Sequence, residues 1–88
     1  MRFSLDIVND KGLHARASAK FVETVERFDA RARVSRDGME VSGDSIMGLM
    51  MLAASRGTSI DIVVDGAEAE ALADALRALV GNRFGEPS

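Results

Sequence analysis

The chain has 88 residues, enough for one domain with a modest core, and 47% of them are hydrophobic. With a formal net charge of −3 and no basic cluster, it is not expected to bind nucleic acid. The absence of cysteine excludes disulfides and thiolate metal sites, and a single histidine argues against zinc, so we expect no cofactor.

Two further features favour a cytoplasmic protein. No apolar run approaches the ~18 residues of a membrane span, so we expect no membrane insertion. Near the N-terminus, Asp6, Asn9 and Asp10 interrupt any apolar segment of the kind that a signal peptide needs.

The first part of the chain predicts a strand followed by a helix. Residues 3–8 alternate between apolar and polar side chains, which is typical of a β-strand, and residues 9–12 are turn formers. A helix is expected within residues 13–28, where apolar residues recur at spacings that place them on one face. These residues are Ala17, Phe21, Val25 and Phe28.

A hairpin is predicted next. Residues 30–35 alternate as a second strand, and residues 39–42 form a short third one. Between them, Asp37-Gly38 indicates a type I′ turn, in which both central residues need positive φ.

The following helix is short and unusually apolar. Asp44 or Ser45 is expected to cap it, residues 46–52 to form it, and Gly57 to end it. A peripheral helix that is apolar on nearly all sides cannot bury every side chain, so some of them are expected to face solvent and form a binding patch. The alternative is that its methionines only fill the core. The side chains expected at this patch are Ile46, Met47 and Met50.

The last third of the chain predicts a strand and a long helix. Residues 60–64 alternate as a fourth strand, and Asp65-Gly66 turns the chain. Residues 67–80 follow as a helix that Gly81 stops. We expect one domain over residues 1–84 and a short flexible tail over residues 85–88.

The element order β-α-β-β-α-β-α predicts an α+β fold, with one antiparallel sheet and all three helices on one face. The expected core residues are Phe3, Leu5, Ile7, Phe21, Val25, Val34, Val41, Leu49, Leu52, Ile62, Val64, Leu72, Leu76 and Leu79.

The only histidine, His14, lies where the first helix is expected to begin. The first turn of a helix has unpaired N–H groups and the positive end of the dipole, so it binds anions and disfavours a charged imidazole. Arg16 adds donors that suit phosphate oxygens. Together these features predict a histidine that accepts a phosphoryl group; the alternative is an ordinary capping or surface histidine.

Two motifs resemble one known family. Residues 12–16, Gly-Leu-His-Ala-Arg, are similar to the active-site motif of HPr, the histidine-containing phosphocarrier of the phosphoenolpyruvate-dependent phosphotransferase system. Residues 44–50 resemble the same family's second signature, around its regulatory serine, and Gly57 follows as the family's glycine does. The resemblance covers roughly residues 3–84.

The resemblance implies an open-faced β-sandwich of four antiparallel strands with three helices on one side. It also implies that His14 accepts the phosphoryl group on Nδ1 from phospho-enzyme I and passes it to an enzyme IIA domain. Arg16 matches the active-site arginine, and the first-turn residues Ala15, Arg16 and Ala17 are the expected phosphate-binding positions. The family usually has proline at this position, where this chain has Ala17. Alanine is compatible with the helix and, unlike proline, has a free N–H donor.

The resemblance further implies regulation and docking. Ser45 matches the serine that an HPr kinase/phosphorylase modifies in some lineages, and Ile46, Met47 and Met50 match the docking surface. The chain is expected to be a monomer. Features at residues 28–30 and 51–52 also look similar to the nitrogen-related branch, NPr, so sugar transport and nitrogen regulation both stay open.

Two alternatives come from other classes of protein. Asp44-Ser45-Ile46 resembles the phosphopantetheine site of acyl carrier proteins, which are helical bundles, whereas this chain shows strand patterns. A non-catalytic α+β interaction or regulatory domain, with His14 only as a cap, is the other alternative.

Overall fold

The structure is a computed structural model that describes all 88 residues. The predicted element order is confirmed, with a 3₁₀ turn, η1, added near the C-terminus. The elements are β1 (Arg2–Asp6), α1 (Ala15–Glu26), β2 (Arg31–Arg36), β3 (Met39–Ser42), α2 (Ile46–Met51), β4 (Ser59–Asp65), α3 (Ala69–Gly81) and η1 (Arg83–Gly85).

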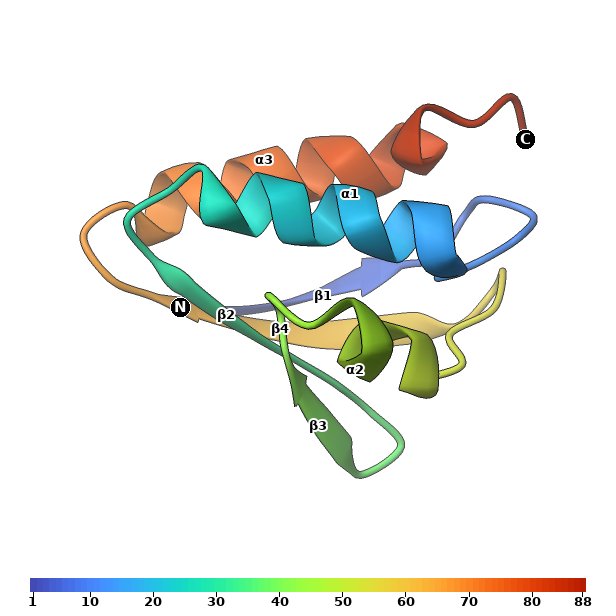
Figure 1. Cartoon of the computed structure of the whole chain (residues 1–88), viewed down its shortest axis with the longest axis horizontal. Coiled ribbons are helices and arrows are strands. Elements are labelled where there is room, and N and C mark those ends of the chain that lie inside the picture. The colour runs from blue at the N-terminus through green and yellow to red at the C-terminus, as the bar shows by residue number, and fades with distance from the viewer.

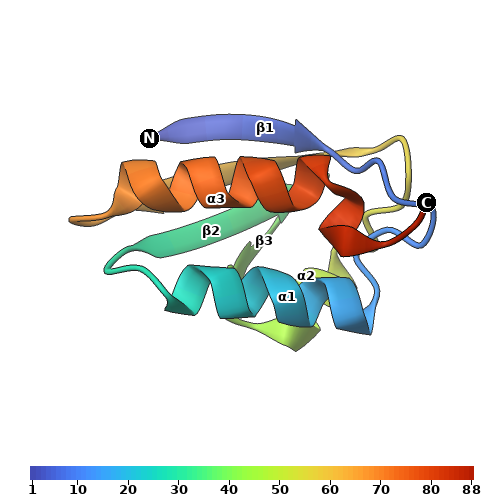
Figure 2. The ribbon, with the colours of Figure 1, turned by 90° about the horizontal axis from the view of Figure 1, so that it is seen from above.

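The four strands form one antiparallel sheet in the order β1-β4-β2-β3. In its register Leu5 lies opposite Ile60, and Ile62 opposite Val34. α1 and α3 lie side by side over one face, and α2 lies beside α1 near the β3 end (Figures 1 and 2). The predicted α+β fold is therefore confirmed, and the sheet contradicts the acyl-carrier alternative. None of the helices has the length and apolar character needed to cross a membrane.

The core lies between the sheet and the helices. Most of the predicted core residues are buried, while four are only partly buried because they lie on edge strands or the flank of α3. These four are Phe3, Leu5, Val41 and Leu79. The core also takes in residues outside the prediction, some from β4 and α3 and others from the loop before α1 and the C-terminal turn. These include Leu13, Ile60, Val80 and Phe84.

The hairpin turn is as predicted, with φ of 51° at Asp37 and 82° at Gly38. The prediction that Gly57 ends the short helix is wrong. α2 ends at Met51, and the chain turns at Ala53, whose φ is 51°. Gly57 instead donates its N–H to the Ile7 carbonyl, so it closes the loop before β4.

α3 begins two residues later than predicted. The preceding residue, Glu68, donates its N–H to the Asp29 carbonyl and accepts the Asp29 N–H with its side chain. These two bonds hold the entry of α3 against the turn between α1 and β2. The helix then continues through Gly81, one residue past the predicted end.

Gly12 shapes the loop before α1. Its φ is +63°, and a Cβ there would lie 2.4 Å from the Ala54 carbonyl oxygen. The close approach lets Leu13 donate its N–H to the same carbonyl at 2.9 Å. The loop from α2 to β4 therefore holds the start of α1 in place.

Gly12→Ala is expected to destabilise the fold by about 3 kcal/mol, since positive φ and a backbone clash both oppose it. Urea unfolding measures the loss. Gly38→Ala is the matched control, because Gly38 has φ +82° but nothing within 4 Å of the added Cβ. It should lose only about 1–2 kcal/mol. Equal losses in the two variants would show that the approach to Ala54 is unimportant.

Candidate functional site

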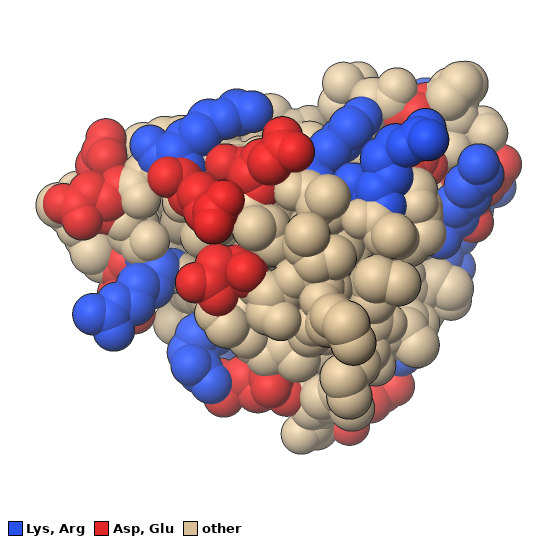
Figure 3. Space-filling model, in the orientation of Figure 1, with Lys and Arg blue, Asp and Glu red and all other residues tan.

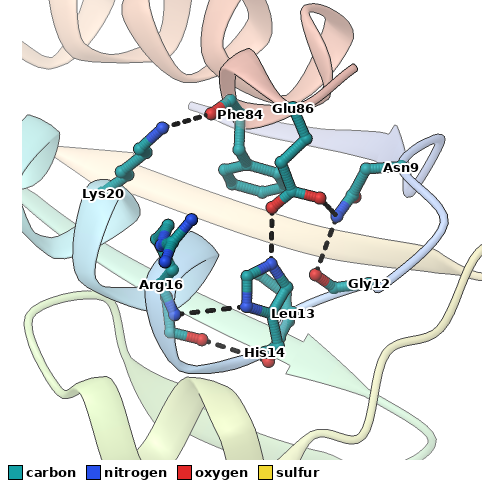
Figure 4. Close-up of polar contacts among 9 residues, drawn as sticks. Asn9, Gly12, Leu13, His14, Arg16, Lys20, Phe84 and Glu86 are labelled. Atoms are coloured by element: carbon teal, nitrogen blue, oxygen red, sulfur yellow. Dashed lines mark hydrogen bonds and ion pairs between the residues drawn. The ribbon is translucent and has the colours of Figure 1, made fainter. Parts of the chain in front are cut away.

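His14 is the N-cap of α1, which confirms its predicted place at the start of that helix. Its backbone is extended, with φ −73° and ψ −178°, and its carbonyl accepts the Ser18 N–H at 2.9 Å. Its ring turns back over the first turn, so that Nδ1 accepts the Arg16 N–H at 3.3 Å (Figure 4). A backbone N–H can only donate, so Nδ1 carries a lone pair and no proton.

The backbone donors of the first turn are available around this nitrogen. The N–H groups of Ala15 and Ala17 have no acceptor within the chain, and that of Arg16 has only the imidazole. These three groups are the expected phosphate-binding positions. Alanine at position 17 leaves a donor where proline would have none. An anion next to Nδ1 would lie at the positive end of a 12-residue helix, where these N–H groups have no backbone partner, although Ala17 itself is buried.

A surface hollow borders the histidine. The Arg16 side chain is exposed and forms no ion pair within the chain, so its guanidinium can turn toward an anion in the hollow. Lys11 contributes a second cation. The lining residues are Asp10, Lys11, His14, Ala15, Arg16, Glu86, Pro87 and Ser88.

Glu86, which lies outside the sequence motifs, is also part of this site. Its Oε2 lies 2.5 Å from His14 Nε2, and its Oε1 accepts from Asn9 Nδ2 at 3.1 Å (Figure 4). Both side chains of the histidine–glutamate pair are largely shielded, with 28% of His14 and 13% of Glu86 exposed. No local pattern could have revealed the pair, because its members lie 72 positions apart.

The chain places Glu86 by a tight turn after α3. Arg83 and Phe84 both have positive φ, and the Phe84 ring is buried in the core. Lys20 on α1 donates to the Phe84 carbonyl at 2.7 Å, and the Asp10 N–H donates to the Ser88 carbonyl at 3.1 Å. Residues 86–88 thus line the site, while the flexibility of residues 85–88 stays a prediction.

The Glu86 carboxyl group has a perturbed acidity. Burial, the largest single influence, raises its pKa, but the hydrogen bonds from His14 and Asn9 lower it. Electrostatic attraction from the His14 ring and from the Lys11 ammonium lowers it further, and the net result is a pKa below the usual range. Glu86 is therefore a carboxylate at neutral pH and accepts hydrogen bonds from both neighbours.

The other predicted residues gather on α2, which packs against α1. Ser45, the N-cap, accepts the Gly48 N–H with its Oγ at 3.0 Å, and Leu49 turns into the core. The remaining apolar side chains are exposed. Ile46, Met47 and Met50, with Met51 in addition, are defined here as the α2 patch. Figure 3 shows an area without charged side chains over α2, bordered on its upper side by basic ones.

The carboxyl group of Glu86 should titrate at a lower pH in the folded protein than in an unstructured chain, where a glutamate has a pKa of about 4.3. Because the folded pKa is the lower one, the contact stabilises the fold above the unfolded pKa, and this stability is lost as pH falls through the folded pKa. Carboxyl ¹³C NMR measures both values, with a peptide of residues 83–88 as reference. Equal midpoints would contradict the contact.

Comparisons with known proteins agree on one family. A family model described as "PTS HPr component phosphorylation site" matches residues 1–82. The phosphocarrier protein HPr of Neisseria meningitidis serogroup A is 49% identical over 87 residues, covering 98% of this chain and 97% of that protein. The phosphocarrier protein HPr of Cupriavidus necator is 48% identical over 80 residues, covering 91% and 90%.

A solved structure gives the same result. The crystal structure of HPr-C-His from Thermoanaerobacter tengcongensis is similar to the whole chain, with a TM-score of 0.94 and 35% identity over 100% of this chain and 99% of that one. The relatives named here are HPr proteins, and the nitrogen-related branch stays a hypothesis. With matches over nearly its full length in both sequence and structure, this chain belongs to the HPr family of phosphocarrier proteins of the phosphotransferase system.

Proposed function

We propose that this protein accepts a phosphoryl group on His14 from phospho-enzyme I and passes it to an enzyme IIA domain. The observation that carries the proposal is the position of His14 Nδ1, an unprotonated nitrogen beside the unpaired N–H groups of a helix N-terminus. A phosphoryl group on this nitrogen would have its oxygens next to those donors.

The transfer follows from this geometry. The Nδ1 lone pair attacks phosphorus, a new N–P bond forms, and the bond from phosphorus to the donor's imidazole nitrogen breaks. The bonding electrons leave with the donor. The N–H groups of residues 15–17 and the Arg16 guanidinium stabilise the phosphoryl oxygens during the transfer. The same steps in reverse deliver the group to an acceptor histidine, which suits a carrier.

The α2 patch is proposed as the surface that meets both partners. All four of its side chains are exposed, with Ile46 at 40%, Met47 at 72%, Met50 at 43% and Met51 at 63%. α2 packs against the helix that carries the site, so one partner could cover both. Methionine side chains repack easily, which suits a surface that binds two different proteins.

Ser45 is proposed as a regulatory site for an HPr kinase/phosphorylase. Its Oγ borders the α2 patch and already accepts a backbone N–H from Gly48. A phosphate there would place about −1.5 to −2 charges at the edge of an apolar docking surface. Docking would then have to desolvate that charge, so phosphorylation should weaken it.

We further propose that the protein works as a cytoplasmic monomer without nucleic-acid partners. Its place in either sugar transport or nitrogen regulation depends on which enzyme IIA accepts the phosphoryl group. The alternative role as a non-catalytic interaction domain requires that His14 stay unmodified, and labelling of His14 decides between the two.

Incubation with enzyme I and phosphoenolpyruvate should add one acid-labile phosphate to the protein, as expected of a phosphorus–nitrogen bond. Mass spectrometry and acid treatment measure it. His14→Ala removes the only histidine, so its label should disappear while its NMR spectrum keeps the native fold. A parent protein that takes no label, or a His14→Ala variant that keeps it, would contradict the proposal.

Ser45→Asp should weaken binding to enzyme I about tenfold or more, because a charge at the patch edge opposes desolvation. Titration calorimetry measures the affinity. Ala71→Asp is the matched control, since it adds the same charge at an exposed position on α3, on the other side of α1 from α2 (Figure 1). If Ser45→Asp bound as tightly as Ala71→Asp, the α2 patch would not be the docking surface or Ser45 would not border it.

A further inference from the structure

We infer that Glu86 is a positioning residue for the phosphoryl acceptor: its carboxylate, anchored by Asn9, holds the proton of His14 on Nε2 and so keeps Nδ1 free for phosphorus. This role rests on the proposed function of His14. It extends that function to the C-terminal residues, which lie outside the residues matched by the family model.

The hydrogen-bond partners of the ring determine its tautomer. Nδ1 faces a backbone N–H, which has no lone pair to offer, and Nε2 faces a carboxylate oxygen, which has no proton to offer at neutral pH. Only the tautomer with its proton on Nε2 satisfies both contacts. Without Glu86, Nε2 would face solvent, and the tautomer with its proton on Nδ1 could form. That tautomer cannot attack phosphorus through Nδ1.

Asn9 shows that the position of Glu86 is built into the fold. Asn9 is completely buried, and its Nδ2 donates both to the Gly12 carbonyl at 2.9 Å and to Glu86 Oε1 at 3.1 Å. Its Oδ1 is buried without a partner, which is costly and unusual. The Asn9 side chain is therefore oriented so that its NH₂ group donates to Glu86 and to the loop before His14, although this orientation leaves its Oδ1 without a partner.

The same contact serves the phosphorylated state. When Nδ1 forms its bond to phosphorus, the ring keeps the Nε2 proton and becomes positively charged. The Glu86 carboxylate, 2.5 Å from Nε2, balances that charge. When the phosphoryl group leaves for an acceptor, the N–P electrons return to Nδ1 and the ring is again neutral imidazole. No proton enters or leaves the ring in either direction.

Three variants separate the contributions of charge and hydrogen bonding. Glu86→Ala removes both, Glu86→Gln keeps an oxygen acceptor but removes the charge, and a chain ending at Gly85 removes residues 86–88. Glu23→Gln is the matched control, because Glu23 is exposed on α1 and forms no hydrogen bond or ion pair through its side chain.

The first measurement is the ¹⁵N spectrum of the labelled imidazole in the unphosphorylated protein. The parent, Glu23→Gln and Glu86→Gln should show the proton on Nε2 alone, while Glu86→Ala and the shortened chain should show a mixture of tautomers. If Glu86 only held the C-terminal residues in place, its loss would leave the tautomer of His14 unchanged in variants whose amide spectra show an intact fold. The Nε2–H tautomer alone in both Glu86→Ala and the shortened chain would overturn the inference.

The second measurement is the rate of phosphoryl transfer from enzyme I with phosphoenolpyruvate as donor. Glu86→Ala should be slower by about tenfold or more, as is typical when the residue that orients a reactive histidine is lost, and Glu86→Gln should recover part of the rate. A parental rate in Glu86→Ala would overturn the inference while leaving His14 as the acceptor. Failure of the parent itself to accept phosphate would overturn the proposed function, whereas the tautomer test would still stand.

Discussion

The imidazole of His14 lies between a hydrogen-bond donor at Nδ1 and a hydrogen-bond acceptor at Nε2. A backbone N–H at the start of α1 requires a lone pair on Nδ1, and the Glu86 carboxylate requires a proton on Nε2. The ring therefore presents an unprotonated Nδ1 beside the unpaired N–H donors of the helix start. A carrier that must gain and lose a phosphoryl group readily benefits from this arrangement, because little reorganisation accompanies either step.

Three distant parts of the chain meet to hold that ring. The loop after β1 supplies Asn9, the α2–β4 loop accepts the Leu13 N–H at Ala54, and the turn after α3 brings in Glu86. The antiparallel sheet makes this meeting possible, because it brings the end of β1 and the start of β4 to the same edge of the molecule. The apolar core under α1 and α3 then fixes the helix start relative to the C-terminal turn.

The sequence predicted the parts of the fold whose causes are local. Alternating residues predicted the strands and Asp37-Gly38 predicted the hairpin. The place of His14 at the start of α1 followed from the helical spacing of residues 17–28. It failed where a distant contact decides the outcome. Glu86 could not be identified, because its role depends on a contact with a residue 72 positions away, and Gly57 was misread because its N–H bonds to Ile7 instead of to α2.

We propose that the fold selects Nδ1 of His14 for phosphorylation. The most direct test is to phosphorylate protein containing ¹⁵N-labelled histidine with enzyme I and phosphoenolpyruvate, and to identify the phosphorus-bearing nitrogen from its ¹⁵N–³¹P coupling. We predict coupling to Nδ1 alone, with the ring proton remaining on Nε2. Coupling to Nε2, or a mixture of the two phosphorylated forms, would contradict the account.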